Sequence, residues 1–118
     1  MKVTNPNPPT GSGGLSYDTM YDAGNTGAGI DINWSTNGHL QKAAINQNTT
    51  LTFTAPAGGC SLKLKLTNGG AYTCALPATV IWAQGVDPII TPTASAVDIV
   101  ALYYDGTNYY GSIIQNAS

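Results

Sequence analysis

From Cys60 to Thr67 the chain alternates strictly between apolar and polar side chains. The apolar positions are Cys60, Leu62, Leu64 and Leu66. A period of two is that of a β-strand with one buried face, because successive side chains of a strand point to opposite sides. We therefore expect a strand whose apolar residues point inward and whose two lysines, Lys63 and Lys65, point outward.

Shorter stretches of the same kind recur along the chain, and turn residues separate them. Asn-Gly at 37–38 and Asn-Gly-Gly at 68–70 predict hairpins, and Asp105–Asn108 predicts a further turn. The expected strands lie at 30–34, 39–45, 50–54, 60–67, 72–76, 80–82, 89–90, 97–104 and 109–114. The apolar run 97–104 suits a central strand, whereas prolines flank 80–82 and 89–90 and favour edge strands. The pattern predicts an all-β protein, an antiparallel two-sheet β-sandwich or jelly roll of about eight strands, without an apparent internal repeat.

The residue composition agrees with strands and argues against helices. Charged residues make up 8% of the chain, against about 25% in an ordinary soluble domain, and arginine and glutamate are absent. Glycine, asparagine, threonine and proline, which are poor helix formers, are frequent instead. Four scattered lysines do not form the basic footprint of a nucleic-acid-binding protein, so we expect no nucleic-acid partner.

Residues 1–29 differ from the rest of the chain and are interpreted as an arm and linker, with the β-sandwich domain at 30–118. The first 14 residues are rich in proline, asparagine and glycine and offer little apolar surface besides Val3. Such a segment cannot build a core of its own, so it is either disordered or ordered by a partner. The stretch 15–22 suits a short turn or an extended anchor, and 23–29 suits a flexible loop.

Several classes of function find no support in the sequence. His39 is the single histidine and has no second ligand beside it, so we interpret it as a solvated residue. The aspartates are spread over loops and outward strand positions, without a nucleophile elbow or a phosphate-binding loop, so we expect no enzymatic activity, no metal and no cofactor. No apolar signal segment follows Lys2, and no apolar run approaches the roughly 20 residues of a membrane helix. We therefore expect synthesis in the cytoplasm without export, and no membrane partner.

The two cysteines and the seven tyrosines leave alternatives open. If 68–70 forms a hairpin turn, Cys74 faces a residue near Leu64, roughly 13 Å along the strand from Cys60. That separation is too large for a disulfide, so we expect two reduced core cysteines, with a disulfide as the alternative. In the last hairpin, each adjacent tyrosine pair is expected to place one ring in the core and one outside. The outer rings either pack on the sheet face or form an oligomer interface or a sugar platform.

From Ile30 to Ser112 the order of segments resembles a β-sandwich module that is common in structural proteins of tailed bacteriophages. The segments that carry the resemblance are INW at 32–34, TTLTFTAPAGG at 49–59, SLKLKLT at 61–67, LPATVIW at 76–82 and VDIVALYYDGTNYYGS at 97–112. The chain departs from the family pattern at Leu76, where an aromatic residue is usual, and at Tyr109, where tryptophan is frequent.

The resemblance implies a structural protein of the virion. Family members often lie at the C-terminal end of tail or fibre proteins, but here the module is nearly the whole chain and follows a short arm. That arrangement is similar to capsid decoration (cement) proteins, which are compact, often trimeric β domains whose arms reach neighbouring capsid subunits. We therefore expect a homotrimer in the virion that binds the major capsid protein, or another virion protein, and stabilises the head. The alternative is a tail-fibre or baseplate tip, or an adhesin-like module, that binds host surface glycans.

The arm is the expected capsid-binding element, because its X-Pro bonds keep it extended and its free backbone groups can pair with a partner strand. Its contact residues are expected to be Lys2, Val3, Asn5, Pro6, Pro8 and Pro9. The base of the arm is expected to lie at the oligomer interface through Leu15, Tyr17, Met20 and Tyr21. The alternative is a disordered terminus without a role.

Overall fold

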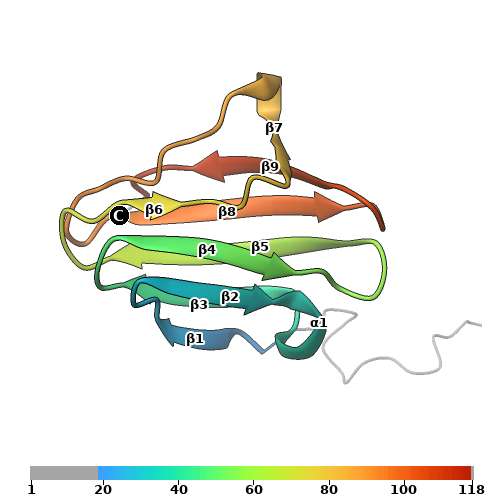
Figure 1. Ribbon diagram of the computed structural model, residues 1–118, viewed down its shortest axis with the longest axis horizontal. Coiled ribbons are helices and arrows are strands. Elements are labelled where there is room, and N and C mark those ends of the chain that lie inside the picture. The colour runs from blue at the N-terminus through green and yellow to red at the C-terminus, as the bar shows by residue number, and fades with distance from the viewer. Residues whose placement is uncertain (1–18, 118) are drawn as a thin grey trace, which may run out of the picture.

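The computed structural model describes residues 19–117, which form nine strands in two sheets, one short helix and one 3-10 turn (Figure 1). The larger sheet has the strand order β1 (Tyr21–Asn25), β3 (Leu40–Ile45), β5 (Cys60–Asn68), β8 (Val97–Tyr104), β9 (Tyr109–Ile114) and β7 (Val80–Trp82). The smaller sheet has the order β2 (Gly29–Asn33), β4 (Thr49–Thr54) and β6 (Cys74–Ala75). The helix α1 (Trp34–Asn37) joins β2 to β3, and the turn η1 (Ala83–Gly85) follows β7. The predicted β-rich fold with two sheets is confirmed.

The first six strands wind as a coil through both sheets. Odd-numbered strands lie in the larger sheet and even-numbered strands in the smaller one, and β1, β2, β3 and β4 each pair in parallel with the strand one turn later. Tyr21 lies beside Gln41 and Gln41 beside Leu64, so one turn takes roughly 20 residues, a length typical of solenoid repeats. The coil thus repeats in space although the sequence shows no repeat, because each turn buries different apolar residues at equivalent positions.

Antiparallel pairing begins where the coil ends. β8 pairs with β5, the turn after Tyr104 returns the chain to β9, and β7 lies parallel to β9 at the sheet edge. The central position of β8, the last hairpin and the edge position of β7 are confirmed predictions. In the hairpin turn, the Asp105 carboxylate accepts hydrogen bonds from the backbone N–H groups of Asn108 at 2.7 Å and Thr107 at 2.8 Å. These bonds lower the pKa of the Asp105 carboxyl below its ordinary value.

The prediction of an antiparallel arrangement is wrong for most of the strands, because five of the seven pairings are parallel. The Asn-Gly signals close corners between the two sheets instead of hairpins within one sheet. Gly38, at φ +97°, ends α1, and 68–70 sends the chain from β5 to β6 in the other sheet. Alternation of apolar and polar residues is the same for both strand directions, so the pattern alone could not decide between them. The strand order of a jelly roll or sandwich is not confirmed.

Asparagine side chains link successive turns of the coil at its corners. Asn46 Oδ1 accepts a hydrogen bond from the backbone N–H of Gly27 at 2.9 Å, and Asn48 Oδ1 accepts one from Thr73 at 2.9 Å. Asn68 is 1% exposed, donates to two loop carbonyls at 2.9 and 3.0 Å and accepts from a loop N–H at 3.2 Å. These bonds satisfy backbone groups that the sheets leave unpaired where the chain changes direction.

The apolar core lies between the two sheets. Its buried residues include Ile32 and Leu51 from the smaller sheet and Ile45, Leu62, Leu64, Leu66 and Val100 from the larger one. The prediction for β5 is confirmed, since its three leucines are at most 1% exposed while Lys63 and Lys65 lie on the solvent side. Cys60 also points inward and is half-buried.

Three local predictions are wrong. Residues 23–25, predicted as loop, belong to β1, because pairing with β3 supplies backbone partners that no local pattern indicates. The segment 89–90 forms no strand in the described structure, although Ile90 is buried. Cys74 lies in the smaller sheet rather than across a hairpin from β5, so the register argument for the cysteines fails. Both cysteines are nevertheless free, as predicted.

Candidate binding surface

Most residues predicted to bind partners lie outside the described part of the chain. This holds for Lys2, Val3, Asn5, Pro6, Pro8, Pro9, Leu15 and Tyr17. Met20 and Tyr21 are described, and their side chains are 42% and 41% exposed. Tyr21 begins β1, which pairs with β3 on one side and has no strand partner on the other side among residues 19–117.

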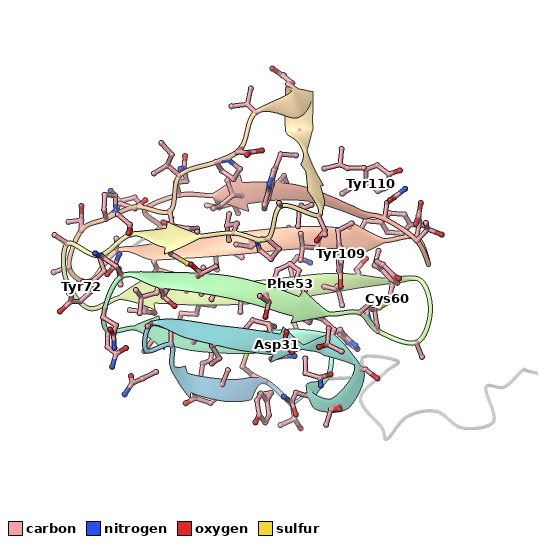
Figure 2. All side chains as sticks on the ribbon, viewed as in Figure 1. Asp31, Phe53, Cys60, Tyr72, Tyr109 and Tyr110 are labelled. Carbon is pink, nitrogen blue, oxygen red and sulfur yellow. The ribbon has the colours of Figure 1, made fainter. Side chains whose placement is uncertain are left out.

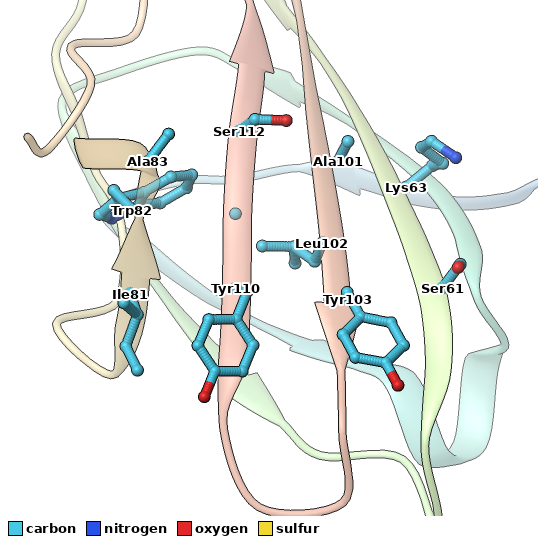
Figure 3. A pocket seen from close by; sticks show the side chains of 11 residues that line it. Ser61, Lys63, Ile81, Trp82, Ala83, Ala101, Leu102, Tyr103, Tyr110 and Ser112 are labelled. Atoms are coloured by element: carbon cyan, nitrogen blue, oxygen red, sulfur yellow. The ribbon is translucent and has the colours of Figure 1, made fainter. Parts of the chain in front are cut away.

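A row of side chains crosses the outer face of the larger sheet. Tyr103 of β8 is paired with Ser61 of β5 on one side and with Tyr110 of β9 on the other. Tyr110 is in turn paired with Ile81 of β7. These four residues form a row across four neighbouring strands, which we call the tyrosine row (Figure 3). Because neighbouring strands lie about 4.8 Å apart, the row spans roughly 14 Å.

The large side chains of the tyrosine row are open to solvent. Tyr103 is 56% exposed, Ile81 47% and Tyr110 42%. Beside the row lies a shallow groove of about 480 Å³ that is also lined by Lys63, Ala101 and Ser112. In Figure 3 the two tyrosine rings lie side by side and point away from Ala101 and Ser112. The small side chains there leave the groove open along the sheet.

The charged residues are distributed unequally over the two outer faces. Lys42, Lys63 and Lys65 are all exposed on the outer face of the larger sheet, where Lys42 is paired with Lys65. Asp22 lies beside Lys42 at the β1 edge, away from the tyrosine row. Asp31 lies on the smaller sheet, where its carboxylate accepts hydrogen bonds from two threonine hydroxyls of β4 at 2.7 Å. The three lysines lie on the side of the tyrosine row that carries the groove, whereas the exposed Asp105 lies two residues beyond Tyr103, in the hairpin turn on the other side of the row.

An aromatic cluster between the sheets supports the hairpin that carries the two exposed tyrosines. The ring of Tyr109 lies 4.7 Å from that of Tyr104 and 5.3 Å from that of Phe53, and the Phe53 ring lies 5.5 Å from that of Trp34. Figure 2 labels Phe53 of β4 and Tyr109 of β9. Each adjacent tyrosine pair thus has one ring inside and one outside, as predicted. Burial raises the pKa of the Tyr109 hydroxyl.

The contact between Trp82 and Gly111 fastens the edge strand β7 to β9. A Cβ atom on Gly111 would lie 2.6 Å from the Trp82 ring and 2.9 Å from Val80 Cγ1. The indole therefore packs directly on the backbone of β9, a contact that requires glycine at this position. It holds Ile81 at the end of the tyrosine row.

Two titratable side chains inside the domain, Cys74 and Asp98, are held by packing and by hydrogen bonds from the backbone. Burial, together with the nearby Asp98 carboxylate, raises the pKa of the Cys74 thiol to about 12, so the thiol is protonated at neutral pH. Asp98 is 1% exposed and accepts hydrogen bonds from the backbone N–H groups of Thr91 at 2.6 Å and Asn116 at 2.7 Å. No cluster of three or more metal-binding side chains occurs in the described range. The chemistry that the surface offers is that of binding, through aromatic rings, hydroxyls and ammonium groups.

Comparison with protein-family models, with curated proteins and with solved structures found no match to this chain. None of the helices within residues 19–117 is long and apolar enough to cross a membrane. The family resemblance of the sequence therefore stays a prediction.

The sequence predicted Ser61 on the polar face of its strand and one outward ring in each adjacent tyrosine pair, without indicating which ring. Alternation within each strand indicates that Tyr103 and Tyr110 point outward once their neighbours point inward. Ile81 joins them through the parallel pairing of β7 with β9, which brings together segments separated by nearly 30 residues. No local signal indicates that pairing.

Proposed function

We propose that this protein is a structural component of a tailed-phage virion, a capsid decoration protein whose N-terminal arm binds the lattice of the major capsid protein. The observation that carries the proposal is the outer edge of β1, which has no strand partner among residues 19–117. Residues 1–18 precede this edge strand, and the side chains of Met20 and Tyr21 at its start are 42% and 41% exposed. An open strand edge beside exposed apolar side chains suits binding of a partner strand or subunit.

The two ends of the larger sheet support assembly into a ring, for which we propose a homotrimer. A closed ring needs a contact in which one surface of each copy meets a different surface of the next copy. β1 with Tyr21 offers the first surface, and the β7 edge offers the second, where Val86 is 66% and Ile89 74% exposed. With 8% charged residues, little like-charge repulsion opposes such contacts.

A repeating lattice makes this mode of attachment effective. Each arm contributes a modest contact, and a ring of copies engages several neighbouring sites at once, so attachment of the whole ring is far tighter than that of one arm. The larger sheet is then held with its outer face, and the tyrosine row on it, turned to a second partner or to solvent.

Deleting Met1–Gly14 tests the proposal. The truncated protein should keep nearly the same melting temperature, because it retains every core residue found within 19–117, but it should fail to bind particles that lack the wild-type protein. Tyr21→Ser should lower the molar mass of the purified protein in solution, measured by light scattering, from that of a trimer toward that of a monomer. Ile114→Ser, which changes a 62% exposed residue in β9, is the matched control. Full occupancy of particles by the truncated protein would show that the arm is not the attachment element.

A further inference from the structure

We propose that the tyrosine row and the lysines beside it bind acidic polysaccharides. In this arrangement pyranose rings lie on Tyr103 and Tyr110, and sugar carboxylates face Lys63. The inference concerns the outer face of the larger sheet and does not depend on how the arm is attached. It adds a second binding function at a distance from the β1 edge.

The two exposed rings form a stacking platform. Tyr103 and Tyr110 are paired across β8 and β9, and no ring-to-ring contact engages either of them among the described residues. One face of a pyranose ring presents C–H groups, which pack on an aromatic face, while hydroxyls such as Ser61 and Ser112 can bond to the sugar hydroxyls. The shallow groove of about 480 Å³ cannot enclose a small molecule, because sites for small ligands bury most of the ligand surface. A polymer that crosses the sheet face suits it better.

The charge around the groove selects an acidic polymer. Lys63 lines the groove itself, and Lys65 lies two residues further along the same strand, about 6.6 Å away. Lys42 is the neighbour of Lys65 on β3. A carboxylate on the polymer would lie within one Debye length of these ammonium groups, so their attraction is felt at physiological salt.

Two other occupants fit this face less well. A second copy of the chain packed face to face over the groove would oppose lysines with lysines, because the exposed aspartates lie away from it, Asp22 at the β1 edge and Asp105 in the hairpin turn beyond the row. A nucleic acid carries a charge on every nucleotide and is bound by many cations, whereas the described residues offer three lysines on this face. A polysaccharide with spaced carboxylates matches both the flat rings and the small number of charges.

The test uses the full-length protein and three polymers, namely polygalacturonate, hyaluronate and polysialic acid, each with its methyl ester. Esterification keeps the pyranose rings and removes the negative charge. Calorimetric titration should detect binding of at least one acidic polymer and clearly weaker binding of its ester.

Variants locate the binding on the tyrosine row. Tyr103→Ala and Tyr110→Ala should each weaken binding of that polymer by about tenfold, the effect typical of a central aromatic contact. Lys63→Gln should weaken it by about threefold and reduce its salt dependence. Ile114→Ala removes a 62% exposed apolar side chain at the far end of β9, outside both the tyrosine row and the proposed ring contacts, and should leave the affinity unchanged. Tyr110→Phe keeps the ring and should bind almost as tightly, which separates loss of stacking from loss of folding.

Each of the following results would overturn the proposal. They are failure of all three polymers to bind, equal binding of an ester and its acid, and wild-type affinity of both alanine variants. Tight binding of poly-glutamate or oligo-thymidine that is insensitive to the tyrosines would indicate attraction by charge alone. Dissociation of the oligomer by Tyr103→Ala would identify a second copy of the chain as the occupant.

Discussion

Replacing Gly111 with alanine tests whether the packing of Trp82 on β9 holds the edge of the larger sheet. The added Cβ would lie 2.6 Å from Cζ3 and 2.8 Å from Cε3 of Trp82, and 2.9 Å from Val80 Cγ1. Carbon atoms prefer separations of about 3.5–4.0 Å, so the indole or the strand must move by most of an ångström. Trp82 and Val80 are each 6% exposed, so the added Cβ meets side chains that are already packed into the domain.

The expected cost follows from these contacts. Overpacking of this kind costs about 1–3 kcal/mol, and alanine offsets about 0.5–1 kcal/mol of it by restricting the unfolded backbone. The net loss, about 1 kcal/mol from the midpoints of these ranges, corresponds to a melting temperature about 4–8 °C lower. The change should be concentrated at β7, which has three residues and pairs with β9 alone.

Thermal unfolding and hydrogen exchange measure the two parts of this prediction. Gly111→Ala should melt below the wild type, and the amides of β7 should exchange faster while those of β5 stay protected. Gly58→Ala is the matched control, since its Cβ would meet nothing within 4 Å, and it should be neutral or slightly stabilising. If Gly111→Ala melts at or above Gly58→Ala with unchanged exchange of β7, the packing argument is refuted.

Two further predictions concern groups inside the domain. The pKa of Cys74 is raised from 9.0 to about 12, so the unfolded chain loses the thiol proton first. The advantage of the wild type over Cys74→Ala in urea unfolding should therefore be complete below pH 9 and shrink as the pH rises toward 12; a constant difference would contradict it. Asn68→Ala leaves buried loop groups without their partner and should cost about 2–4 kcal/mol. Asn48 makes one exposed hydrogen bond, so Asn48→Ala should lower the free energy of unfolding by about 1 kcal/mol or less. Equal losses for Asn48→Ala and Asn68→Ala would contradict the role of burial.

Most strands were predictable from the sequence, although β1 was not, whereas of their pairings the last hairpin alone was predicted. Alternation in β5 places its leucines inside and its lysines outside whichever strand lies beside it, so burial followed from the pattern alone. Direction depends on where the chain goes next, and Asn37-Gly38 supports a hairpin turn and a helix end equally well. The corner at Asn68 is decided by bonds to loops that lie up to 23 residues away. Such bonds leave no signature in a window of local sequence.

For the binding surface, too, the sequence of a strand predicts which way its side chains point but not which strands lie beside it. The outward direction of Tyr103 is a property of β8, but its neighbours Ser61 and Tyr110 come from two other strands. The strand β1 was not predicted either, because it contains Gly24 at φ +82°, and a glycine at such a position is typical of a loop. The direction of a single side chain could therefore be predicted from its own strand. Which side chains lie together on the surface follows from the strand pairing, which the sequence did not indicate.

The coil formed by β1–β6 determines where the protein opens first. A turn of a coil contacts only the turns next to it, so its resistance to local unfolding depends on how many neighbours it has. Among residues 19–117, the terminal strands β1, β2, β6 and β7 have one neighbouring strand each, whereas β5 lies between β3 and β8. Transient opening should therefore start at these terminal strands, β1 among them, and leave β5 and β8 closed. A partner that holds the β1 edge would act as the missing neighbour, so slower amide exchange in β1 would report attachment without any change elsewhere in the domain.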